Sequence, residues 1–264
     1  MSEVVQRTVQ DGVAVLTLNR PDRLNAWTPE MGRAYFDSLA ECAALEQVRV
    51  IVVTGAGRGF CAGADMENLQ SLGENGAEPS AGEPDPRPQS YPLSISKPVI
   101  AAVNGACAGI GLVLALMCDL RFVAEGAKLT TAFARRGLVA EYGIAWILPR
   151  LLGPARALDL LLSGRVVLGE EAAALGLANR AIAPERLLDE TLAYARDLAV
   201  NCSPASMAAM KAQVYADLER GLDGALAEAG RLMLGSFAQP DFKEGVASFM
   251  ERREPRFAPL ASLR

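Results

Sequence analysis

A long uncharged apolar run limits the possible folds of this 264-residue chain more than any other segment. No side chain between Pro98 and Cys118 carries a charge, and a run of this length could cross a bilayer. Pro98, Asn104 and three glycines, however, divide the run into two apolar halves, VIAAV and LVLALM. Because proline and glycine interrupt a continuous helix, the run predicts a buried strand, a turn and a buried helix, and no membrane span.

The segments before this run alternate between strand and helix patterns. Three short segments rich in β-branched residues are predicted to be strands, at residues 13–19, 48–55 and 99–105. Residues 28–46 predict a helix, with Thr28 as its N-cap and Pro29 at its first position. This order of strand, helix and strand indicates an α/β fold with parallel strands.

The second half of the chain ends in helix patterns only. Four consecutive helices are predicted, at residues 184–200, 203–221, 222–236 and 240–255. We therefore expect a core at residues 1–198, followed by a helical region at 199–264 that forms a second layer or an oligomerisation module. Within the core, residues 71–92 contain five prolines and three glycines, which predicts a mobile loop that acts as a lid or is an inert insertion.

The composition excludes several kinds of function. The net charge of −5 argues against a general nucleic-acid binder, which would carry a basic face. The five cysteines are widely spaced and form no CxxC pair, so neither a metal site nor a disulfide framework is expected. The first residues lack the apolar segment of a signal peptide, which favours a cytoplasmic protein. With no histidine in the chain, acid–base catalysis must use carboxylates, Lys, Tyr or Cys.

Two glycine-rich turns are candidates for binding an anion through the backbone. The stretch GIGLVL lacks the third glycine of a dinucleotide-binding loop, and TGAGRGFCAG at 54–63 lacks the ending of a phosphate-binding loop. The glycines of residues 105–111 either permit close packing or leave free N–H groups at the start of the following helix. An oxyanion site would need a second N–H donor, and the turn Ala62-Gly63-Ala64 is the natural source.

Taken together, these segments resemble the crotonase family, also called the enoyl-CoA hydratase/isomerase superfamily. The resemblance is carried by GRGFCAGADMENL at 57–69, followed by KPVIAAVNGACAGIGLVLALMCDLRF at 97–122. Three further segments support it in the expected order, LNRPDRLNAW at 18–27, RRGLVAEYGIAWILPRLLG at 135–153 and DFKEGVASFMERREPRF at 241–257. The resemblance thus spans nearly the whole chain.

The resemblance implies a spiral of ββα units with a helical C-terminal trimerisation region, assembled as a homotrimer or as a hexamer made of two trimers. It implies acyl-CoA substrates and no metal or redox cofactor, since coenzyme A is part of the substrate. The backbone N–H groups of Ala64 and Ile110 would hold the thioester oxygen as it becomes an enolate. The other matched substrate-binding positions are Arg23, Leu24, Ala26, Ala62, Asp65, Met66 and Glu67.

The chain departs from the family's hydratases at both catalytic glutamates. Val113 and Phe133 stand at those two positions, and neither side chain can activate water. Glu141 matches the position at which isomerase-type members carry a single acid, and we expect Val139, Ile144 and Trp146 to raise its pKa. Without the family match, Glu141 would be taken for a solvated loop carboxylate.

A single carboxylate favours double-bond isomerisation of an enoyl-CoA. Enoyl-CoA hydration, thioester hydrolysis, ring isomerisation and a non-catalytic acyl-CoA-binding trimer remain alternatives. Other polar residues have structural interpretations: Asp65 is expected to cap a helix or brace its turn, and Asp119 to end a helix and hold a loop. Tyr142 could position Glu141 or the acyl chain.

Overall fold

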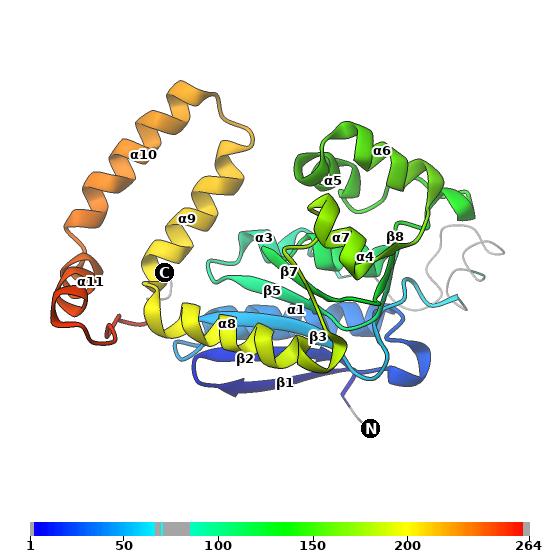
Figure 1. The fold of residues 1–264 in the computed structure, drawn as a ribbon, viewed down its shortest axis with the longest axis horizontal. Coiled ribbons are helices and arrows are strands. Elements are labelled where there is room, and N and C mark those ends of the chain that lie inside the picture. Colours follow the sequence, from blue (N-terminus) through cyan, green and yellow to red (C-terminus); the bar gives the residue numbers. More distant parts are fainter. Residues whose placement is uncertain (1–2, 67–69, 71–84, 261–264) are drawn as a thin grey trace.

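The strands of the protein form two sheets. The computed structural model describes residues 3–66, 70 and 85–260 (Figure 1). The larger sheet contains, in spatial order, β1 (Val5–Gln10), β2 (Val13–Leu18), β3 (Val50–Gly55), β5 (Val99–Val103), β7 (Leu120–Ala124) and β10 (Arg180–Ile182). The smaller sheet contains β4 (Gly59–Cys61), β6 (Ala106–Ala108), β8 (Lys128–Thr130) and β9 (Val167–Leu168). This mixed architecture agrees with the predicted α/β class.

Most neighbouring strands are parallel, as the sequence predicted. In the larger sheet β2, β3, β5, β7 and β10 pair in parallel, and only β1 is antiparallel to its neighbour β2. The sequence patterns did not reveal β1, because five of its six residues are exposed and provide no apolar alternation. In the smaller sheet β4, β6 and β8 are parallel, and β9 runs antiparallel to β8.

The uncharged apolar run folds as two strands and one helix. Its first half is β5, all five of whose residues are buried, and its second half is the fully buried helix α4 (Ile110–Leu116). The turn expected between them also contains the short strand β6. No helix in the described part of the chain is long and apolar enough to cross a membrane.

Helices cover the sheets and extend beyond them. Besides α4, the described residues before the C-terminal region form α1 (Pro29–Ala44), α3 (Tyr91–Ser94), α5 (Ile144–Leu152), α6 (Pro154–Ser163) and α7 (Gly169–Leu175), with short 3-10 turns at Pro21–Arg23, Ala134–Arg136 and Pro184–Arg186. The predicted cap of α1 is confirmed, because the Thr28 hydroxyl accepts a hydrogen bond from the Met31 N–H at 3.2 Å. Most of the loop predicted at 71–92 lies outside the described residues, and α3 begins within its last two positions.

All four predicted C-terminal helices are present. They are α8 (Leu187–Asn201), α9 (Pro204–Asp217), α10 (Leu222–Phe237) and α11 (Pro240–Glu251). Helix α8 packs on the larger sheet, whereas α9 to α11 reach away from the sheets as an arm (Figure 1). The expected boundary at 198/199 falls in the last turn of α8, and the arm starts after that helix ends.

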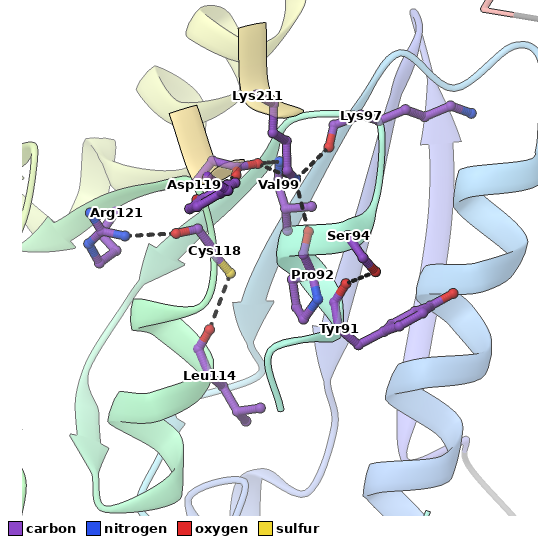
Figure 2. Close-up of polar contacts among 11 residues, drawn as sticks. Tyr91, Pro92, Ser94, Lys97, Val99, Leu114, Cys118, Asp119, Arg121 and Lys211 are labelled. Carbon is purple, nitrogen blue, oxygen red and sulfur yellow. Dashed lines mark hydrogen bonds and ion pairs between the residues drawn. The ribbon is translucent and has the colours of Figure 1, made fainter. Parts of the chain in front are cut away.

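A buried ion pair joins the arm to the core. Lys211 of α9 donates to the Asp119 carboxylate at 2.7 Å and to the carbonyls of Pro92 and Lys97 at 2.8 and 3.1 Å (Figure 2). Asp119 also accepts hydrogen bonds from the Val99 N–H at 2.7 Å and the Tyr215 hydroxyl at 2.9 Å. Asp119 does not end α4, which stops at Leu116 with Met117 as its cap. It does hold neighbouring chain, directly at the Val99 N–H and through Lys211 at the segment that carries α3.

Replacing Asp119 by alanine is expected to lower the free energy of unfolding by about 3–5 kcal/mol, because it leaves the buried Lys211 without its counter-charge. The matched control is Glu228→Ala, which breaks an exposed ion pair with Arg231 on α10 and should change stability little. Urea denaturation of both variants measures the difference. Equal midpoints would contradict a stabilising role for the buried pair.

Candidate active site

A cavity of about 900 Å³ opens where three parallel strands of the smaller sheet end. The turns after β4 and β6 supply Ala64 and Ile110, and the turn after β8 supplies Thr131 to Phe133. The loop before α5 adds Leu138, Glu141 and Tyr142. Because the three strands are parallel neighbours, their C-terminal ends lie side by side, and this brings distant segments of the chain to one site.

The N–H of Ala64 is turned away from the neighbouring backbone. In the bridge between these segments, the Trp27 N–H donates to the Gly63 carbonyl at 2.8 Å, and the Asp65 N–H donates to the Trp27 carbonyl at 3.0 Å. In a parallel bridge of this form, the N–H of the middle residue points to the other side. No described residue accepts a hydrogen bond from the Ala64 N–H.

The N–H of Ile110 is free for a different reason. Ile110 is the first residue of α4, and the first N–H groups of a helix have no partner inside it. Gly109, which precedes it, has a φ of 52°, in the left-handed region that favours glycine, and its own N–H donates to Thr130 at 3.1 Å. In the described part of the chain nothing accepts from the Ile110 N–H, so both predicted donors are available at the cavity.

Glycine permits the two turns to approach closely. A Cβ atom on Gly111 would lie 2.0 Å from the carbonyl oxygen of Cys61, and one on Gly63 would lie 3.2 Å from that of Ala108. Any larger residue at Gly111 would therefore push α4 away from β4. The glycines that the sequence analysis weighed between packing and anion binding permit the close packing. That packing places the two N–H groups, which have no acceptor among the described residues, beside one cavity.

Glu141 lies on the cavity wall and is partly buried. Loss of solvent raises the pKa of its carboxyl group above the ordinary value, in the predicted direction. Among the described residues, none hydrogen-bonds or ion-pairs with this carboxylate. The expectation that Val139 shields Glu141 is wrong, because Val139 is 77% exposed and does not line the cavity.

The two positions at which hydratases of the resembled family carry glutamate are apolar in the folded protein too. Val113 is completely buried within α4, and Phe133 is 5% exposed and contributes its side chain to the cavity wall. Glu141 and Asp65 are the acidic residues among the described cavity-lining residues. Asp65 pairs with Arg20 at 2.9 Å, which confirms the expectation that it braces its turn.

Most of the predicted substrate-binding residues line this cavity. They are Arg23, Ala26, Ala62, Ala64, Asp65, Met66 and Ile110. Leu24 does not line it; its backbone faces the turn after β4, where its carbonyl accepts the Ala62 N–H at 3.0 Å. Glu67 lies outside the described residues.

The sequence analysis missed the polar and apolar residues that follow β8. Thr131, Ala132, Arg136 and Leu138 line the cavity. Arg136 and Leu138 lie in the quoted segment 135–153 but were not singled out there. Thr131 and Ala132 belong to none of the quoted segments, and the pairing of β8 with β6 brings them to the site. The described residues contain no group of three or more acidic, Cys or His side chains that could hold a metal ion.

The fold and the cavity define a class of protein, one in which two backbone N–H donors and a partly buried carboxylate face one cavity. The profile of the enoyl-CoA hydratase/isomerase family matches residues 8–259. The 1,2-epoxyphenylacetyl-CoA isomerase of Escherichia coli is 35% identical, over 97% of this chain and 99% of that protein. The chain belongs to this family, which is the crotonase superfamily.

Solved structures agree with this assignment. A probable enoyl-CoA hydratase/isomerase from Mycobacterium abscessus superposes with a TM-score of 0.88 at 34% identity, over 97% of this chain and 99% of that one. An enoyl-CoA hydratase from Mycobacterium marinum is 50% identical with a TM-score of 0.71, over 83% of this chain and 100% of that one. The names of these proteins include both hydratase and isomerase, so the family alone does not choose the reaction.

Replacing Gly111 by alanine is expected to separate the two turns, because the new methyl group would overlap the Cys61 carbonyl. We expect a loss of about 1–3 kcal/mol of stability and a clear loss of affinity for a saturated acyl-CoA, measured by calorimetry. Gly126→Ala is the matched control, because a Cβ atom there meets nothing within 4 Å. Unchanged binding by the Gly111 variant would show that the close approach is not needed.

Proposed function

We propose that the protein isomerises the double bond of an enoyl-CoA thioester, with Glu141 as the only acid–base group. The observation that carries the proposal is that, on the described cavity wall, Glu141 is the carboxylate that is not held in an ion pair. Glu141 lines the cavity and has a raised pKa, whereas Val113 and Phe133 replace the two acids that hydration requires. Asp65, the other acidic residue on the described wall, is held in an ion pair with Arg20.

The proposed reaction moves one proton and consumes no water. The Glu141 carboxylate removes a proton from C2 of a 3-enoyl-CoA, and the electron pair shifts toward the thioester oxygen to form a dienolate. The protonated Glu141 then returns the proton to C4 while the electrons move back, which places the double bond between C2 and C3. Glu141 ends in its original state, so one carboxylate suffices.

The two backbone N–H groups have a defined part in this proposal. The thioester oxygen gains negative charge as the dienolate forms, and fixed donors stabilise that charge more than they stabilise the neutral thioester. The N–H groups of Ala64 and Ile110 have no other acceptor among the described residues, which supports this assignment. The apolar surroundings of Phe133 and Ile110 strengthen such hydrogen bonds.

A second candidate is ring isomerisation of an acyl-CoA. It is favoured by one observation, the likeness over nearly the full length to a protein named 1,2-epoxyphenylacetyl-CoA isomerase. The same oxyanion donors and Glu141 would serve this reaction. Enoyl-CoA hydration has the names of other relatives in its favour, but the apolar residues Val113 and Phe133 oppose it.

The remaining proposals concern partners and location. We propose that coenzyme A enters only as part of the substrate, that no metal or other cofactor takes part, and that the protein acts in the cytoplasm. A homotrimer or a hexamer is supported by the large apolar side chains that α10 and α11 expose, among them Leu222, Leu234, Phe249 and Met250. Exposed apolar surface of this extent is typical of an interface between proteins.

Replacing Glu141 by glutamine is expected to reduce isomerisation of 3-hexenoyl-CoA by about 10²- to 10⁴-fold, because the amide cannot accept the C2 proton. Absorbance of the conjugated product and proton exchange in heavy water report the reaction. Glu170→Gln, on the exposed surface of α7, is the matched control and should keep the wild-type rate.

Two outcomes would contradict this account. Rapid hydration of crotonyl-CoA that persists in the Glu141→Gln variant would require a different acid. Tight acyl-CoA binding by the wild-type protein without exchange at C2 or C4 would favour a non-catalytic binding protein.

The pH dependence follows from the raised pKa of Glu141. Glu141 must be ionised to accept the proton, so kcat/KM is expected to rise with pH through this pKa and then level off. Because burial raises the pKa, half of the activity should be lost at a pH above the ordinary range of a glutamate. Stopped assays from pH 4 upward test this, with folding checked at each pH. A midpoint at or below that range would contradict the role given to burial.

A further inference from the structure

The turn that carries Glu141, at residues 139–143, has few hydrogen bonds of its own. None of its backbone N–H groups donates to a described residue, and the Glu141 carboxylate has no partner there either. Tyr142 and Gly143 have left-handed φ values of 54° and 82°, and this conformation is costly for a bulky aromatic residue. The chain on either side of the turn must therefore set the position of Glu141 at the cavity.

Hydrogen bonds join this turn to the first residues of α5. The Glu141 carbonyl accepts from the Ile144 N–H at 3.1 Å. The Gly143 carbonyl accepts from the N–H groups of Trp146 and Ile147 at 3.0 and 3.2 Å. Any shift or rotation at the start of α5 therefore moves the backbone of Glu141 with it. Ile144 and Ile147 are buried in the core, which fixes one face of this helix.

The arm holds another face of α5 through Glu219, which follows α9. One oxygen of the Glu219 carboxylate accepts from the Trp146 indole N–H at 3.1 Å and from the Arg150 guanidinium at 3.0 Å. Trp146 and Arg150 share a face because they are four residues apart in the helix. The guanidinium also lies over the indole ring, 4.1 Å from its centroid, and donates to the Trp146 carbonyl at 3.0 Å. Three side chains thus form one closed group between the arm and α5.

Glu219 lies close to a fixed point of the arm. Lys211 is anchored in the core by the Asp119 carboxylate and the Pro92 carbonyl, and its side chain is 7% exposed (Figure 2). Helix α9 continues from Lys211 to Asp217 without a break, so Glu219 lies about 12 Å further along. Glu219 is therefore attached to the core independently of α5, and it can hold that helix in place.

We propose that Glu219 is a positioning residue for the reaction: by holding Trp146 and Arg150 it fixes the start of α5, and with it the backbone of Glu141. Trp146 does not line the active-site cavity, so the group acts on Glu141 through the backbone of the turn. The inference rests on the proposed function in that Glu141 is taken as the base. It gives the arm a part in catalysis in addition to the assembly proposed above.

Replacing Glu219 by alanine should lower kcat for 3-hexenoyl-CoA by about three- to fivefold, because a less firmly held base is less often aligned with the proton. The effect is limited because the lost contacts are exposed. KM should stay the same, since Glu219 does not line the cavity. The midpoint of urea unfolding should also stay close to that of the wild type, because an exposed ion pair contributes little to stability.

Further variants separate positioning from a general effect. Glu219→Gln keeps an oxygen that can accept from the Trp146 indole and should retain more than half of the wild-type kcat. Arg150→Ala should lower kcat as Glu219→Ala does, and the double variant should be no slower than the slower single variant. Asp217→Ala is the matched control, because it breaks an ion pair with Arg220 at the same end of α9; its kcat should not change.

The pH profile is a measurement that a merely structural role would leave unchanged. Burial raises the pKa of Glu141, and a turn that is held less firmly lets more water reach the carboxylate. The pH midpoint of kcat/KM should therefore fall in Glu219→Ala, toward the ordinary range of a glutamate, and stay unchanged in Asp217→Ala. These variants leave in place the other titratable or charged residues of the described cavity wall, which are Arg23, Asp65, Arg136 and Tyr142.

Hydrogen exchange tests the same contact without catalysis. With the whole chain, the amides of residues 144–147 should exchange about threefold faster in Glu219→Ala than in the wild type, and at the wild-type rate in Asp217→Ala. If the wild type does not isomerise 3-hexenoyl-CoA but exchange changes in this way, the proposed reaction is wrong and the hold of the arm on α5 stands. Unchanged exchange in Glu219→Ala, or an active wild type whose kcat and pH midpoint persist in that variant, would overturn the inference alone.

Discussion

The parallel pairing of β4 with β6 is the constraint on which the site depends. The pairing aligns Cys61 with Cys107, and each strand ends in a turn that presents one free N–H group. Close contact between the backbones at Gly63 and Gly111 holds these turns together. Because the proposed donors belong to the backbone, the charge stabilisation that we propose needs no polar side chain. This is compatible with a chain that contains no histidine.

On this scaffold, the proposed chemistry depends on a few side chains. Phe133 lines the cavity and Val113 is buried within α4, so neither position brings a charge. Among the described cavity-lining residues, the Glu141 carboxylate is in no ion pair, whereas that of Asp65 pairs with Arg20. The strands and turns could support several reactions, and we infer that the identity of three residues selects among them.

The sequence predicted the features that depend on local patterns. The division of the apolar run at Asn104, the Thr28 cap and the four C-terminal helices each follow from neighbouring residues, and all are present. Strand β1 was missed because its surface is mostly exposed, and β6 because three residues are too short for a recognisable alternation. Asp65 and Glu141 were found through the family motif rather than from periodicity.

Residues that depend on long-range pairing could not be predicted. Thr131 and Ala132 reach the cavity only because β8 lies beside β6, and nothing local marks Leu24 as facing away from the cavity. The segment that carries α3 is likewise held from 119 residues away in the sequence, because Lys211 donates to the Pro92 carbonyl. Contacts of this kind arise from the assembled fold and leave no signal in a single sequence.

A crystal structure with a bound, unreactive acyl-CoA tests the central claim most directly. The account predicts that the thioester oxygen lies about 2.7–3.1 Å from the backbone nitrogens of both Ala64 and Ile110, with the Glu141 carboxylate facing C2 and C4. A thioester oxygen bound elsewhere, or a Glu141 side chain turned away from these carbons, would contradict it.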